Sequence, residues 1–71
     1  MKIKLTPNLR VLIAQKNIKQ KELAEIIGVD PFSVSRWVNG AAIPPLETAY
    51  KLAIILECKV DDLWLPEKIE D

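Results

Sequence analysis

The segment PFSVSRWVN, residues 31–39, contains the side chains with the clearest capacity for recognition chemistry. On a helical wheel of about 100° per residue, Phe32 and Arg36 share one side and are flanked by Ser33, Ser35 and Asn39. An Arg guanidinium can hold guanine O6 and N7 with two parallel hydrogen bonds. Ser and Asn can bond bases or phosphates, and a Phe ring can pack on a thymine methyl group. A helix with this outward face has the chemistry to read the major groove of duplex DNA.

Several of these residues also have a simpler interpretation. Arg36 could be an ordinary solvated Arg on a surface helix, and its interpretation as a base reader depends on the geometry of the neighbouring segments. An outward Phe32 could read DNA, bind a protein or fold back onto a neighbouring helix. Trp37 shares its side of the helix with Val34 and Val38, so it is predicted to lie in the core.

The preceding segment predicts how this helix is held. Residues 20–28, QKELAEIIG, form an amphipathic helix that is expected to end at Gly28, which tolerates a left-handed backbone. Asp30 is the predicted N-cap of the next helix, and Pro31 is its predicted first residue. A turn of about three residues that contains Gly, between two short helices, is the helix-turn-helix geometry.

Signals for a helix also precede and follow this pair. Thr6 is the predicted N-cap of a first helix, with Pro7 at its first position. That helix should end near Lys16, and Asn17 then suits a left-handed position.

The fold class is therefore predicted to be all-α, a compact bundle of about five short helices in a single domain. Further helices are expected at about 46–56 and 60–64. The domain spans 1–71, with its core at about 7–64 and a loose acidic tail at 65–71.

Composition excludes several functions. The chain has one Cys and no His, so we expect no intramolecular disulfide, no metal site and no cofactor. We expect no enzymatic activity, because nucleophile motifs, glycine-rich phosphate loops and evident carboxylate pairs are all missing from the sequence. No apolar run approaches the roughly 18 residues of a membrane span, and MKIKLT is too short and charged for a signal peptide. We expect a cytoplasmic protein with no membrane partner and no small-molecule effector domain.

Charge is unevenly distributed along the chain, although the formal net charge is zero. Residues 1–40 hold seven basic and three acidic side chains, a net charge of +4, whereas residues 41–71 hold three basic and seven acidic ones, a net charge of −4. Such a split can orient a protein on a polyanion, although it could also arise by chance among solvated charges.

Several motifs in fixed order resemble the Cro/lambda-repressor (XRE-like) type of helix-turn-helix regulator. They are Q-x-E-L-A-x-x-x-G-V, V-S-R-W-x-N-G, L-E-T-A-x-K-L-A and V-D-D-L, and they extend over roughly residues 7–64. The resemblance implies a bundle of about five helices that binds duplex DNA, usually as a dimer, and regulates transcription.

The resemblance also assigns roles to individual residues. Gln20 matches a position that holds a phosphate at a helix N-terminus, with Lys19 and Lys21 beside it. Asn39 matches a phosphate-contacting Asn, and Arg36 occupies a common base-reading position. The predicted DNA contacts are Phe32, Ser33, Ser35 and Arg36 to bases, and Lys19, Gln20, Lys21 and Asn39 to phosphates.

The chain departs from the family pattern at several of its positions. Pro31 and Phe32 stand where family members often have polar residues that read bases. Neither side chain can hydrogen-bond, so we expect fewer direct hydrogen bonds to bases than is usual. The loop of residues 41–43, Ala-Ala-Ile, lacks the basic side chains that often touch phosphates. Glu57 stands where Gly is usual, which is unfavourable if the backbone there is left-handed.

One further departure is a matched pair. Many family members join an Arg of the first helix to a Glu near the end of the third, and the matching residues here are Ile13 and Val38. Because both charges are replaced together by apolar groups, these two side chains are expected to be in contact.

The favoured function is sequence-specific binding of double-stranded DNA by a small repressor-like regulator that acts as a homodimer. Candidate dimer surfaces are Ile43, Leu63, Trp64 and Leu65, or the alternating segment of residues 2–5 paired with its copy; Trp64 could equally be core. The alternative function is a protein-interaction module that keeps the helix-turn-helix fold without binding DNA.

Overall fold

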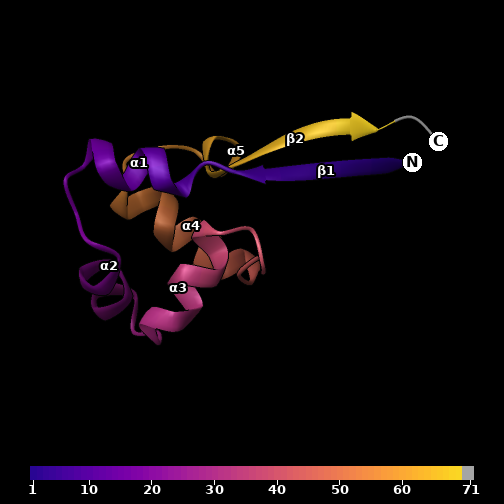
Figure 1. The fold of residues 1–71 in the computed structure, drawn as a ribbon. Helices are drawn as coiled ribbons and strands as arrows, with labels where there is room; N and C mark the ends of the chain where they lie inside the picture. Colours follow the sequence, from indigo (N-terminus) through magenta and orange to yellow (C-terminus); the bar gives the residue numbers. More distant parts are fainter. Residues whose placement is uncertain (70–71) are drawn as a thin grey trace.

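The computed structural model describes residues 1–69, which form five helices and a two-stranded ribbon (Figure 1). The elements in chain order are β1 (Lys2–Pro7), α1 (Leu9–Gln15), α2 (Gln20–Ile27), α3 (Pro31–Val38), α4 (Leu46–Ile55), α5 (Val60–Leu63) and β2 (Trp64–Ile69). The five predicted helices are present. The prediction of an all-α fold is inexact, because the two strands form a small antiparallel sheet.

The ribbon joins segments from opposite ends of the described chain. β1 and β2 pair from Lys2 with Ile69 to Pro7 with Trp64, and the ribbon projects from the helical body (Figure 1). Residues 65–69 are therefore a strand and not a loose tail, while residues 70 and 71 of the predicted tail lie outside the described residues. The alternating residues 2–5 do form a strand, and one edge of it pairs with β2 of the same chain. Local sequence patterns do not reveal a pairing between such distant segments.

The first helix begins later than predicted. Thr6 and Pro7 belong to β1, and Asn8 precedes the helix. The backbone N–H of Asn8 donates to the carbonyl oxygen of Leu63 at 2.9 Å, and its side-chain amide donates to that of Asp62 at 3.1 Å. These two bonds fasten the start of α1 to α5, so the chain becomes helical only after them.

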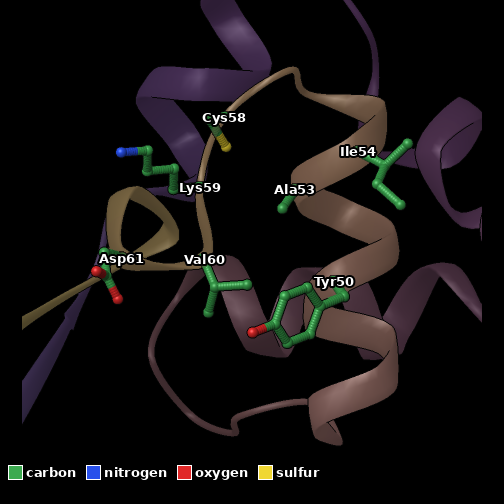
Figure 2. Close-up of a pocket in the computed structure, with 7 residues that line it drawn as sticks. All are labelled: Tyr50, Ala53, Ile54, Cys58, Lys59, Val60 and Asp61. Atoms are coloured by element: carbon green, nitrogen blue, oxygen red, sulfur yellow. The ribbon is translucent and has the colours of Figure 1, made fainter.

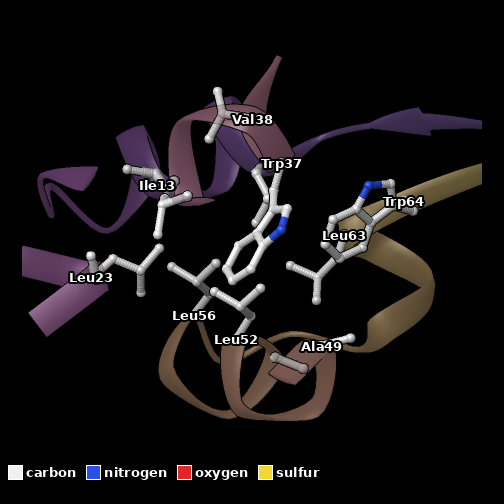
Figure 3. Close-up of a cluster of buried hydrophobic side chains, with 13 residues drawn as sticks. Ile13, Leu23, Trp37, Val38, Ala49, Leu52, Leu56, Leu63 and Trp64 are labelled. Atoms are coloured by element: carbon white, nitrogen blue, oxygen red, sulfur yellow. The ribbon is translucent and has the colours of Figure 1, made fainter. Parts of the chain in front are cut away.

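One buried apolar cluster holds the helices together (Figure 3). Its largest fully buried members are Leu9, Leu23, Val34, Leu52 and Leu63. Ile13 and Val38 are both buried in this cluster, and their direct contact stays a prediction.

Two residues of the predicted dimer surface belong to this core. Leu63 is completely buried and cannot meet a partner, and Trp64, at 6% exposed, offers only a small edge to the surface. Trp64 pairs with Pro7 at the base of the ribbon, and its side chain belongs to the buried cluster. Ile43 and Leu65 remain exposed, at 59% and 45%.

Among residues 1–69, two non-glycine residues have left-handed backbones, with φ of 52° at Asn17 and 54° at Glu57. The left-handed Asn17 is confirmed, and Glu57 takes the conformation that the usual Gly would favour. The Lys16 ammonium lies 2.8 Å from the Glu57 carboxylate. The hydrogen bond and the charge of Lys16 together lower the pKa of the Glu57 carboxyl from its ordinary value.

The single cysteine lies just after this left-handed residue. Cys58 is half-buried against the core and lines an open hollow of about 380 Å³ with Tyr50 and Ile54 (Figure 2). Burial raises the pKa of its thiol, which keeps the sulfur in its less reactive protonated form. Among residues 1–69, no helix is both long enough and apolar enough to cross a bilayer.

Candidate nucleic-acid interface

The turn between α2 and α3 has the predicted geometry. Gly28 ends α2 with φ of 87°, and its N–H donates to the carbonyl oxygen of Ala24 at 2.8 Å. Asp30 caps α3, because its carboxylate accepts the N–H of Phe32 at 2.7 Å. Pro31 is the first helical residue, where its missing N–H leaves no bond unmade. This turn fixes α3 against α2 and determines which side of α3 faces outward.

Helix α3 has one buried and one exposed side. Val34 is fully buried and Trp37 is 6% exposed, so Trp37 is core as predicted (Figure 3). On the opposite side Phe32 is 69% exposed, so it does not fold back onto a neighbouring helix. The Arg36 guanidinium carbon lies 6.0 Å from the centre of the Phe32 ring, within the range of a cation–π contact. The two residues form an exposed pair that restricts the Arg side chain while its donors remain at the surface.

A polar network links α3 to α1. The Asn39 side-chain amide donates to the Ser35 hydroxyl at 3.4 Å, and its carbonyl oxygen accepts from the Arg10 guanidinium at 3.0 Å. Arg10 and Asn39 are both exposed, whereas Ser33 and Ser35 are half-buried. The network orients two groups that suit phosphate binding, a guanidinium and an amide.

Sequence reasoning counted Arg10 only as a charge and did not include it in the site. Arg10 and Asn39 are 29 positions apart, so no helical spacing connects them. The uneven charge of the first forty residues was the one available signal, and it does not single out Arg10 among seven basic residues.

The N-terminus of α2 is a second candidate contact. Lys19 precedes the helix, and Gln20 is its first residue. Lys19 and Lys21 are exposed and Gln20 is half-buried. The Glu22 carboxylate accepts the Lys19 N–H at 3.3 Å, so one donor at this end already has a partner. First-turn N–H groups without intrahelical partners remain as donors for a phosphate oxygen.

The structure modifies the predicted charge separation. Between Leu9 and Asn39 there are five basic and three acidic side chains, a net charge of +2. The remaining basic residues of the first forty, Lys2 and Lys4, lie in the ribbon, where Lys4 stands opposite Glu67. The helices that carry the candidate site are therefore only modestly basic. The loop at 41–43 adds no charge to them.

Comparison with known proteins gives two findings. The model of the helix-turn-helix family matches residues 9–63. Among solved structures, the chain is similar to that of "a putative DNA-binding protein from Bacteroides fragilis", with a TM-score of 0.80 and 26% sequence identity over 86% of this chain and 98% of the other. No curated protein matches the chain.

Proposed function

The chain belongs to the XRE-type helix-turn-helix family of DNA-binding regulators, and we propose that it binds duplex DNA sequence-specifically. It acts as a homodimer and a repressor-like regulator of transcription in the cytoplasm. The observation that carries this proposal is the exposed Phe32–Arg36 pair on α3, opposite a side that is firmly buried in the core. The similarity to "a putative DNA-binding protein from Bacteroides fragilis" supports it.

In this proposal α3 lies in the major groove. Arg36 donates two hydrogen bonds to guanine O6 and N7, and Phe32 packs on a thymine methyl group. Ser33 and Ser35 lie beside this pair and add hydroxyl groups within reach of base edges. The half-buried position of both Ser residues limits them to short-range contacts.

Phosphate contacts fix the helix in the groove from two sides. Lys19, Gln20 and Lys21 hold one phosphate at the N-terminus of α2. Asn39, with its amide oriented by Arg10, holds another at the end of α3. These contacts carry no sequence information, but they determine the register in which Arg36 meets the bases.

Fluorescence anisotropy with labelled duplex tests the proposal. Wild-type protein is titrated into random-sequence DNA at low and rising salt, and a preferred operator is then selected from a random pool. Arg36→Ala should lose most of the operator preference while it binds random DNA nearly as well as wild type. Lys51→Ala, which removes an exposed charge from α4, is the matched control and should change neither.

Two results would count against it. One is no binding to random DNA at about 50 µM protein and low salt, because non-specific dissociation constants are typically about 10⁻⁴ to 10⁻⁶ M. The other is an Arg36→Ala variant with unchanged operator preference.

The second candidate function is a protein-interaction module. The 69% exposure of Phe32 and the uncharged loop at 41–43 favour it, because both present apolar surface where family members often have polar or basic groups. In that case partner binding should be insensitive to salt and Phe32→Ala should abolish it, with no affinity for DNA.

A further inference from the structure

The ribbon has two chemically different faces. Paired residues of antiparallel strands lie on the same face, and successive residues alternate between faces. One face therefore carries Ile3 with Lys68, Leu5 with Pro66 and Pro7 with Trp64. We call this the apolar ribbon face, because Lys68 is its one charged member. The other face holds Lys2, Lys4, Thr6 and Glu67 together with Leu65 and Ile69, so it mixes polar and apolar side chains.

The apolar ribbon face forms one wall of a groove. Leu5, Trp64 and Pro66 line it from the ribbon, and Ile43 and Leu46 line it from the loop before α4 and from the start of that helix. The groove has a volume of about 280 Å³, and Asp61 of α5 contributes the acidic group of its lining.

Most of this surface is exposed in the single chain. The exposed fractions are 55% for Ile3, 59% for Ile43 and 70% for Leu46. A two-stranded ribbon alone is at best marginally stable in water, and it gains stability when an apolar face packs on another element. Within residues 1–69 only the base of the ribbon is covered in this way, at Pro7 and Trp64.

We propose that a second copy of this chain covers the groove, with the apolar ribbon face of each copy lying across the groove of the other about a two-fold axis. This proposal rests on the proposed function, because it assigns a surface to the homodimer named there. Complementary charge and apolar surface favour a second copy of this chain as the partner in the groove. The ribbon presents Lys68 beside apolar groups, and the groove presents Asp61 beside apolar groups, so each copy supplies what the other needs.

The proposed packing is face to face and does not use the outer edge of β2. Pro66 lacks a backbone N–H, and strands tolerate proline where the missing N–H would point away from the paired strand. The outer edge of β2 is therefore poorly suited to accept another strand. The ribbon projects from the body at the end opposite α2 (Figure 1), so a copy held there leaves the N-terminus of α2 open to DNA.

Sedimentation velocity without DNA tests the surface. Leu46→Glu places a charge in the groove at the first position of α4, where an acidic residue favours the helix. It should weaken dimerisation at least about tenfold. Ile54→Lys is the control, because Ile54 is on the same helix, is 76% exposed and lies outside this groove. It should leave the dimer unchanged.

Charge reversal tests the orientation of the two copies. Asp61→Lys and Lys68→Asp should each weaken the dimer, and the double variant, in which each copy carries both changes, should restore it. A double variant that dimerises as weakly as the single variants would overturn the arrangement in which Lys68 of each copy meets Asp61 of the other. Circular dichroism confirms that each variant remains helical.

The remaining outcomes separate this inference from the proposed function. A wild-type protein that stays monomeric up to about 0.5 mM would overturn both the inference and the homodimer of the proposed function. A dimer that Ile54→Lys disrupts and Leu46→Glu does not would overturn the inference alone. Random-sequence DNA binding, measured in parallel, tests the proposed function alone, because phosphate contacts do not need a dimer.

Discussion

Replacing Arg36 with Lys separates the two ways in which this side chain could act on DNA. The substitution keeps the positive charge and the exposed position. It removes the planar fork that matches guanine, and it weakens the stacking on the Phe32 ring 6.0 Å away. If Arg36 reads a base, Lys should lose specificity. If Arg36 only attracts phosphates, Lys should replace it with little loss.

The expected magnitude follows from the geometry of the contact. A bidentate Arg–guanine pair is worth about 1–3 kcal/mol of discrimination, or about 5- to 150-fold for one half-site. Two half-sites in a homodimer would double the free energy, to about 2–6 kcal/mol. Affinity for random DNA should change by less than about 0.5 kcal/mol, because the side chain is exposed and its charge is retained.

Anisotropy titrations of the selected operator and of random duplex, at matched salt, give both quantities. Arg36→Lys should lower operator affinity and leave the slope of log affinity against log salt unchanged. Equal losses on operator and random DNA would refute the reasoning, because they would show that Arg36 contributes only to phosphate binding.

Further predictions concern the network, the core and the strained turn. Arg10→Ala and Asn39→Ala should each weaken random-DNA binding by about 0.5–1.5 kcal/mol. The double variant should lose less than the sum of the two, because the two side chains are hydrogen-bonded to each other. Additive losses in the anisotropy assay would show that the two residues act independently. Leu63→Ala should lower the free energy of unfolding by about 2–5 kcal/mol, whereas Leu65→Ala should lower it by under about 1 kcal/mol, as urea denaturation can measure. Glu57→Gly should raise Tm by up to about 5 °C by relieving the left-handed backbone. Glu57→Gln should lower Tm at neutral pH but not at low pH. The folded-state pKa of Glu57 is lowered, so its ion pair with Lys16 stabilises the fold above about pH 4.5 and stops doing so as the pH falls through that lowered pKa. Equal losses of Tm for Glu57→Gln at pH 3 and pH 7 would contradict this.

Local sequence signals predicted the helix-turn-helix well. Gly28, Asp30 and Pro31 each act on the backbone within a few residues, so their effect can be read without knowledge of the rest of the chain. The same holds for Asn17, whose left-handed backbone ends a helix. Trp37 was placed in the core correctly, because helical spacing alone puts it beside Val34.

The ribbon and the Arg10 contact required non-local information. Thr6 and Pro7 satisfy the rules for a helix start, but the backbone bonds of β1 to β2 and of Asn8 to α5 outweigh a cap. The sequence pattern predicts Leu63 as one of the candidate residues of a dimer surface. In the structure Leu63 packs into the helical core, and Asn8 binds the end of α5, so its side chain is completely buried.

The small number of base contacts that one α3 helix can make gives the proposed dimer surface an energetic role in DNA recognition. A specific DNA-binding protein typically prefers its site over random DNA by about 4–10 kcal/mol. One α3 helix offers a single Arg fork, worth about 1–3 kcal/mol, together with an apolar contact from Phe32. A monomer therefore falls short, and a dimer that doubles these contacts reaches the lower part of the range. It follows that Leu46→Glu, which leaves every DNA-facing side chain intact, should make the protein a non-specific binder at concentrations where the wild type still selects its operator. A Leu46→Glu variant that is monomeric and keeps full operator preference would show that one α3 reads more of the sequence than Arg36 and Phe32 can supply.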